Sequence, residues 1–168
     1  MLGIHNNAGS VALTIGDTPA ARAHLESARR AAEAIGFPQL IPFVNLAEVR
    51  RAEHDLDGAR AGFEDVVRMS RRAGDKYALA GAILGLACLA ADLEDWHGAA
   101  VLYGAEHNLM DQIGARWNPF DARRRQESLD RAGAALGDEQ FQRAYARGMA
   151  LSFDQAISLA LDDILPGT

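Results

Sequence analysis

The 168-residue sequence has a single cysteine, Cys88, and only one of its 17 basic residues is a lysine. One cysteine excludes an internal disulfide and a multi-cysteine zinc site. No window is apolar over the roughly 18 residues that a membrane-spanning helix needs. The first residues also lack the basic segment and apolar run of a signal peptide. We therefore expect a protein of the cytoplasm that does not contact the membrane.

Positive charge is scarce, because 17 basic residues face 23 acidic ones and the net charge is -6. Proteins that bind nucleic acid usually need a basic surface to neutralise phosphates, so we expect no direct binding to DNA or RNA. The sequence has no G-x-x-x-x-G-K-[ST] loop, no H-E-x-x-H pair and no G-x-S-x-G turn. We accordingly expect a non-enzymatic chain without cofactor or metal.

Alanine is abundant, with 33 residues, while β-branched residues are few. Alanine is the best helix former, so the composition predicts an all-α fold. The length fits one domain, residues 1–168. The longest apolar stretch, from Tyr77 to Ala91, suits a buried helix, in which Cys88 behaves as a small apolar residue.

Three similar units follow one another at spacings of 38 and 40 residues. Each has an aspartate at a central turn and a glycine at its end: Asp17, Asp55 and Asp95, then Gly36, Gly74 and Gly114. Aspartate caps the start of a helix, and glycine ends a helix because it tolerates a left-handed backbone. The pattern predicts nine helices in antiparallel pairs, at residues 3–15, 19–35, 39–54, 58–73, 77–93, 96–113, 119–136, 139–149 and 153–163. Such an arrangement is a helical solenoid.

The units resemble the tetratricopeptide repeat pattern W-x2-L-G-x2-Y…A-x3-F. The second unit reads Phe43-x2-Leu46-Ala47…Ala59-x3-Phe63. Equivalent small and large residues in the other units are Gly9, Ala21 and Leu25, and Ala87, Ala99 and Tyr103. The resemblance implies a tetratricopeptide-like solenoid of helical hairpins with a right-handed superhelix. Its repeats would cover residues 3–36, 39–74 and 77–114, followed by a divergent helical pair and a capping helix within 117–163.

The later part of the chain resembles the C-terminal repeat region of actinobacterial LuxR-type and AfsR-like ATPase transcriptional regulators. The resemblance is carried by the segments Trp96–Ala105, Ile113–Ala115, Leu136–Asp138, Ala144–Gly148 and Leu151–Ala156. It implies the protein–protein interaction or signal-coupling module of such a regulator. The sequence contains neither the ATPase loop nor a basic recognition helix, so those two activities are not expected here.

The resemblance also implies a concave groove lined by the first helix of each repeat, which would hold a protein or peptide partner. Asn7 and Asn45 occupy matching positions there, and an asparagine amide can both donate to and accept from a peptide backbone. Alternatively, the two asparagines only bridge neighbouring helices, or the groove senses a small-molecule effector. The candidate binding residues are Asn6, Asn7, Ser10, Val44, Asn45, Glu48, Arg51, Leu84 and Cys88.

Three further segments lead to predictions. Trp117 and Phe120 are expected to dock the divergent pair, and the following run of Arg123–Arg125 favours a solvated helix face over an anion patch. The capping box from Ser152 to Gln155 predicts an amphipathic last helix that either caps the solenoid or docks a partner. At the other end, the apolar face around Ile4 has no predicted covering helix, which predicts self-association through residues 1–35, either as a homodimer or by borrowing a helix.

Overall fold

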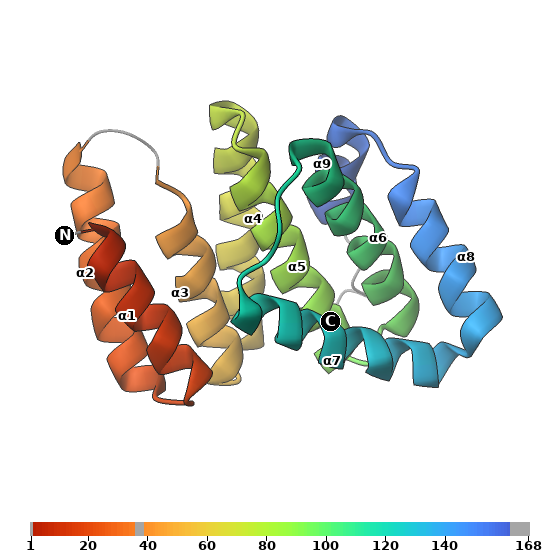
Figure 1. The fold of residues 1–168 in the computed structure, drawn as a ribbon, viewed down its shortest axis with the longest axis horizontal. Helices are drawn as coiled ribbons and strands as arrows, with labels where there is room; N and C mark the ends of the chain where they lie inside the picture. The colour runs from red at the N-terminus through yellow and green to blue at the C-terminus, as the bar shows by residue number, and fades with distance from the viewer. Residues whose placement is uncertain (1, 36–38, 162–168) are drawn as a thin grey trace.

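The computed structural model describes residues 2–35 and 39–161, and within them the fold is all-helical, with nine helices and no strand (Figure 1). The all-α prediction is confirmed, and each described helix boundary lies within two residues of its predicted position. The predicted stop at Gly36 and the predicted helical residues 162–163 lie outside the described residues. The helices are α1 (Leu2–Thr14), α2 (Thr18–Ile35), α3 (Ile41–Ala52), α4 (Leu56–Ala73), α5 (Lys76–Asp92), α6 (Trp96–Ile113), α7 (Pro119–Leu136), α8 (Asp138–Met149) and α9 (Phe153–Leu161).

The tight turns of the three units have one common geometry. In each, an aspartate carboxylate accepts a hydrogen bond from the backbone N–H three residues later, at 3.0, 3.0 and 2.9 Å for Asp17, Asp55 and Asp95. The residue before each aspartate has a left-handed backbone conformation, with φ of 77° at Gly16 and 62° at His54 and Glu94. Helices α4 and α6 end at left-handed glycines, Gly74 and Gly114. The predicted caps and stops therefore set the described helix ends of these units.

The core is centred on α5, in which every residue from Ala78 to Ala91 is buried. A helix that is apolar on all sides must be covered on all sides, and α3, α4, α6 and α7 all contact α5. The large residues of the three units, Leu25, Phe63 and Tyr103, are fully buried, as are the alanines four positions before them. No helix in the described part of the chain is both long and apolar enough to cross a membrane.

Helices α1 to α6 pack in sequence order, and α1, α3 and α5 share one face, which we name the first-helix face (Figure 1). Helix α7 does not extend this row but lies across the first-helix face, where it contacts both α5 and α6. Helix α8 runs along α6, where Gly104 and Gly148 let the two backbones meet. The helix expected as a cap, α9, packs against α4 and α6 with Ala156, Ile157 and Ala160 buried.

Candidate binding groove

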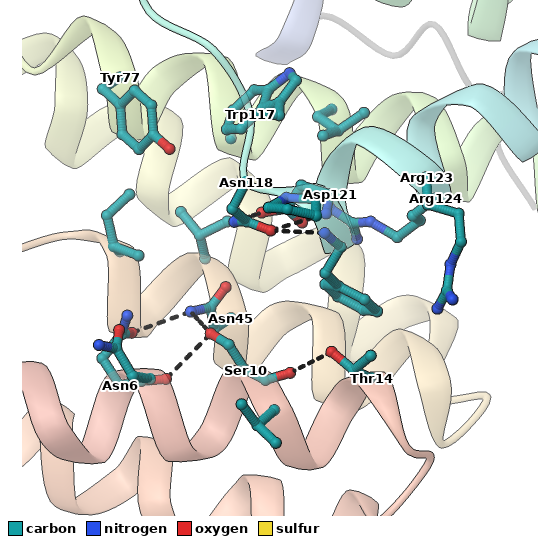
Figure 2. A pocket seen from close by; sticks show the side chains of 18 residues that line it. Asn6, Ser10, Thr14, Asn45, Tyr77, Trp117, Asn118, Asp121, Arg123 and Arg124 are labelled. Atoms are coloured by element: carbon teal, nitrogen blue, oxygen red, sulfur yellow. Dashed lines mark hydrogen bonds and ion pairs between the residues drawn. The ribbon is translucent and has the colours of Figure 1, made fainter.

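A cavity of about 680 Å³ lies between the first-helix face and the beginning of α7 (Figure 2). We call it the groove. Its floor is formed by apolar parts of α3 and α5, one wall by α1, and the other by the residues around the start of α7. The lining residues are Asn6, Asn7, Ser10, Val11, Thr14, Ile41, Val44, Asn45, Tyr77, Gly81, Leu84, Trp117, Asn118, Pro119, Phe120, Asp121, Arg123 and Arg124.

The α1 wall is neutral and polar. Asn6, Ser10 and Thr14 follow one another a helical turn apart, and Asn45 reaches them from α3. The Asn45 side-chain amide donates to Asn6 Oδ1 at 3.0 Å and to Ser10 Oγ at 3.3 Å, as Figure 2 shows. Asn45 thus bridges two helices, which is one of the two roles that the sequence left open.

Asn7 differs from its repeat equivalent Asn45. It is exposed, and its side chain forms no hydrogen bond with any described residue. Its amide therefore keeps one acceptor and two donors available at the rim of the groove.

The opposite wall is fixed by the cap of α7. Asn118 Oδ1 accepts hydrogen bonds from the backbone N–H groups of Phe120 and Asp121, both at 3.0 Å. Trp117, just before it, packs against Tyr77 with ring centroids 5.3 Å apart and donates from Nε1 to Glu106 Oε1 at 2.6 Å. These contacts anchor the entry to α7, and Trp117 has the docking role predicted for it.

An ion-pair network, buried at Glu48 and Arg124 and exposed at Arg131, attaches α7 to the first-helix face. Glu48 of α3 accepts from Arg51 Nη2 at 2.7 Å and also pairs with Arg124 of α7. Arg51 also pairs with Asp92 of α5, and Asp92 in turn pairs with Arg131 of α7 at 3.1 Å. Positive and negative groups therefore alternate across the contact between α3, α5 and α7.

Glu48 is the centre of this network. Burial alone raises the pKa of its carboxyl, but the adjacent charges of Arg124 and Arg51 outweigh burial and hold the pKa below its ordinary value. Glu48 is therefore ionised at neutral pH. Without Glu48, Arg51 would keep only Asp92 and Arg124 only Asp121 as ion-pair partners, and the buried contact would lose the carboxylate that the two arginines share.

A second buried carboxylate, Glu106 of α6, holds the other side of α7. Its Oε2 accepts from Arg125 Nε at 2.5 Å, and Arg125 Nη2 donates to the Tyr145 hydroxyl at 3.1 Å. Burial raises the pKa of Glu106 more than Arg125 lowers it. Tyr145 also contacts His107 Nδ1 at 2.6 Å, so α6, α7 and α8 are joined through one polar cluster.

The nine candidate residues divide into two groups. Six line the groove: Asn6, Asn7, Ser10, Val44, Asn45 and Leu84. The other three, Glu48, Arg51 and Cys88, lie where α7 covers the first-helix face. The expectation that one groove contains all nine residues is therefore corrected. Cys88 is buried beside the Tyr103 hydroxyl, and burial raises the pKa of its thiol, which keeps it protonated.

The expectation of a solvated arginine run is wrong for two of its three members. Arg124 and Arg125 are largely buried in ion pairs with Glu48 and Glu106, and only Arg123 is exposed. Sequence reasoning missed the α7 wall because the acidic partners lie far away along the chain. One signal was present, since Arg124 and Arg131 are seven residues apart and therefore share a helix face.

No protein-family model matches the chain, and comparison with curated proteins and with solved structures found no match. Among the described residues, no three His, Cys, Asp or Glu side chains converge as a metal site would require. The groove therefore presents amides, hydroxyls, apolar side chains, the ion pair of Asp121 with Arg124 and the exposed Arg123.

Proposed function

We propose that the chain is a non-enzymatic protein–protein interaction module that holds a segment of a partner protein in the groove. The observation that carries this proposal is the position of α7. Part of the first-helix face already holds a helical segment of the same chain, and the groove occupies the part that α7 leaves open. The groove lies beside this helix on the same face, and we infer that a segment of the partner occupies it.

The α1 wall suits an extended peptide. Side chains four residues apart on a helix are about 6 Å apart along its axis, and alternate residues of an extended chain repeat at about 6.6 Å. Asn6, Ser10 and Thr14 therefore match the spacing of the backbone groups along one edge of such a peptide. Ile41 of the floor and Phe120 of the α7 wall, both partly exposed, would contact its apolar side chains, and Arg123 would favour an acidic residue nearby.

We further propose that the helices form a tetratricopeptide-like solenoid with a right-handed superhelix. Support comes from turns of one geometry at spacings of 38 and 40 residues and from buried small and large residues at matching places.

We place this module in a cytoplasmic transcriptional regulator of the LuxR-type or AfsR-like class. There it would couple a bound partner to ATPase and DNA-binding parts, on the strength of the resembling segments in α6, α8 and the start of α9.

A small-molecule effector is the second candidate ligand, and the size of the groove favours it. Small-molecule sites usually measure about 300–1,000 Å³ and combine an apolar lining with a few polar groups. The groove of about 680 Å³, with its apolar floor and the free Asn7 amide, falls within that description.

The test is a selection of peptides from a random library on the wild-type chain, followed by affinity measurements. The variant Asn7→Ala/Arg123→Ala removes two exposed groove side chains that hold no buried partner. We expect it to weaken the selected peptides at least about tenfold, or about 1.4 kcal/mol. The matched control Gln142→Ala/Arg147→Ala removes an exposed amide and an exposed arginine from α8 and should leave affinity unchanged.

Peptides that bind wild type and the groove variant equally would contradict the peptide proposal. The effector alternative is tested by thermal unfolding with a metabolite library, because a ligand of the folded state raises the melting temperature. A stabilising metabolite whose effect is lost in the groove variant, without selected peptides, would assign the groove to small molecules.

A further inference from the structure

Helix α1 carries a stripe of exposed apolar side chains. Ile4, Val11 and Ile15 are 72%, 61% and 74% exposed, and Ala8 lies between them. At about 100° per residue these four side chains fall within an arc of about 60°. Ile15 follows α1 but stays in helical register, because its N–H donates to the Val11 carbonyl at 3.2 Å. Large apolar side chains this exposed and this close together mark an interaction surface.

The repeat register shows what such a stripe does in the later units. Val11 corresponds to Val49 in α3 and to Leu89 in α5, both of which are fully buried. Val49 is covered by Ala21 and Leu25 of the preceding unit. The same position is thus a helix-packing position in α3 and α5, and in α1 it is exposed among the described residues. The shape of the stripe fits a helix rather than an extended chain.

Charge and spacing favour a second copy of α1 as the covering helix. Helix α1 contains no Asp, Glu, Lys or Arg, so two copies can meet without like-charge repulsion. Helix α8, far from α1 in Figure 1, exposes charged residues such as Glu139, Arg143 and Arg147, which do not complement an apolar stripe. A contact of α1 with α1 therefore closes by two-fold symmetry, whereas a contact of α1 with α8 would build an open chain.

We propose that two copies of this chain associate through α1, with the two helices antiparallel across a two-fold axis. The stripe has the palindromic spacing 4–3–4, so two antiparallel copies stay in register along its whole length, and the dipoles of antiparallel helices oppose each other favourably. Ile4 meets the partner subunit's Ile15, and Ala8 meets the partner subunit's Val11. This inference does not depend on the ligand of the groove.

The dimer has a consequence for the groove. Val11 belongs to the stripe and also lines the groove, so the two grooves flank the two-fold axis. A partner with two copies of the bound segment would then gain avidity, because its second segment binds intramolecularly.

Sedimentation velocity over a wide dilution series tests the association. We expect wild type to dimerise and Ile4→Glu/Ile15→Glu to weaken the dimer at least about tenfold, or about 1.4 kcal/mol. Both substituted side chains are exposed, and the equivalent of Ile15 in the second unit is already Glu53, so the variant should fold. The matched control is Leu93→Glu, at the Ile15 equivalent of the third unit and 43% exposed, which should dimerise as wild type does.

A wild-type chain that stays monomeric at every concentration would overturn the proposal, as would a dimer that Ile4→Glu/Ile15→Glu leaves intact.

The direction of the helices is tested by disulfide cross-linking. A mixture of Ile4→Cys and Ile15→Cys chains should cross-link, and neither chain alone should. Cross-linking of each chain alone would show parallel helices and reject the antiparallel pairing. The native Cys88 is buried, so unsubstituted chain serves as the background control.

Discussion

At the scale of single residues, the Glu48 carboxylate decides whether α7 stays on the first-helix face. We expect Glu48→Gln to lower the free energy of unfolding by about 2–4 kcal/mol at neutral pH, because Arg51 would keep only Asp92 and Arg124 only Asp121 as counterions, both less buried than Glu48. Urea unfolding measures the loss. The matched control is Glu127→Gln on the exposed side of α7, which we expect to change stability by no more than about 0.5 kcal/mol.

The same variant has a defined pH dependence. The pKa of Glu48 is lower in the folded chain than in the unfolded chain, where a glutamate has a pKa of about 4.3. Its stabilisation is therefore complete above that value and is lost as the pH falls through the lower folded pKa. The stability gap between wild type and Glu48→Gln should close in acid. A gap that stays constant down to strongly acidic pH would show that the charge of Glu48 is not what stabilises the contact.

Two glycines, Gly148 and Gly133, differ in what surrounds them. A Cβ on Gly148 would overlap the Val101 carbonyl oxygen and lie 2.8 Å from the Ala105 nitrogen, so α8 would have to move away from α6. We expect Gly148→Ala to lower the free energy of unfolding by at least about 2–3 kcal/mol.

A Cβ on Gly133, inside α7, meets nothing within 4 Å among the described residues. Gly133→Ala should gain about 0.5–1 kcal/mol. Thermal unfolding measures both, and equal effects would refute the close approach.

At the scale of secondary-structure elements, the turns before α4 and α6 contain avoidable strain. His54 and Glu94 are left-handed at φ of 62°, where Gly16 stands in the equivalent first turn. A side chain there costs energy that glycine does not, offset in part by the greater freedom of glycine when unfolded. We expect His54→Gly and Glu94→Gly each to stabilise the chain by up to about 1 kcal/mol in urea unfolding.

The control for these turns is Ala61→Gly, at an exposed position in the middle of α4, which should cost about 1 kcal/mol. If all three glycine variants lose stability alike, the left-handed turns carry no strain that glycine relieves.

The helices could be predicted from sequence because their ends are set locally. Asp55 and Gly74, for example, fix the start and end of α4 through hydrogen bonds and backbone angles within a few residues. The position of α7 could not be predicted in the same way. Its contacts join Arg124 to Glu48 and Arg131 to Asp92. Helical periodicity shows which residues share a face, but it does not identify the distant acidic residue with which an arginine pairs. The wall of the groove formed by α7 could therefore not be predicted from the sequence.

At the scale of the whole molecule, stability is expected to differ between the two ends of the helical row. The main core extends from Leu40 to Ala160 and contains all of the buried part of α5. Helices α1 and α2 join α3 through a separate and much smaller cluster of Ala12, Ala21, Leu25 and Val49. Regions held by few buried apolar contacts open independently of the rest.

We therefore expect backbone amides of α1 and α2 to exchange hydrogen at least about tenfold faster than those of α5 and α6, which corresponds to about 1.4 kcal/mol. Mass spectrometry of peptides after timed labelling measures these rates, with dilute protein so that self-association does not contribute. Raising the protein concentration should then slow exchange in α1 and leave α5 unchanged, because the apolar stripe would become covered by a second copy. Equal exchange in all four helices of dilute protein would mean that the small cluster transmits the full stability of the main core to α1 and α2.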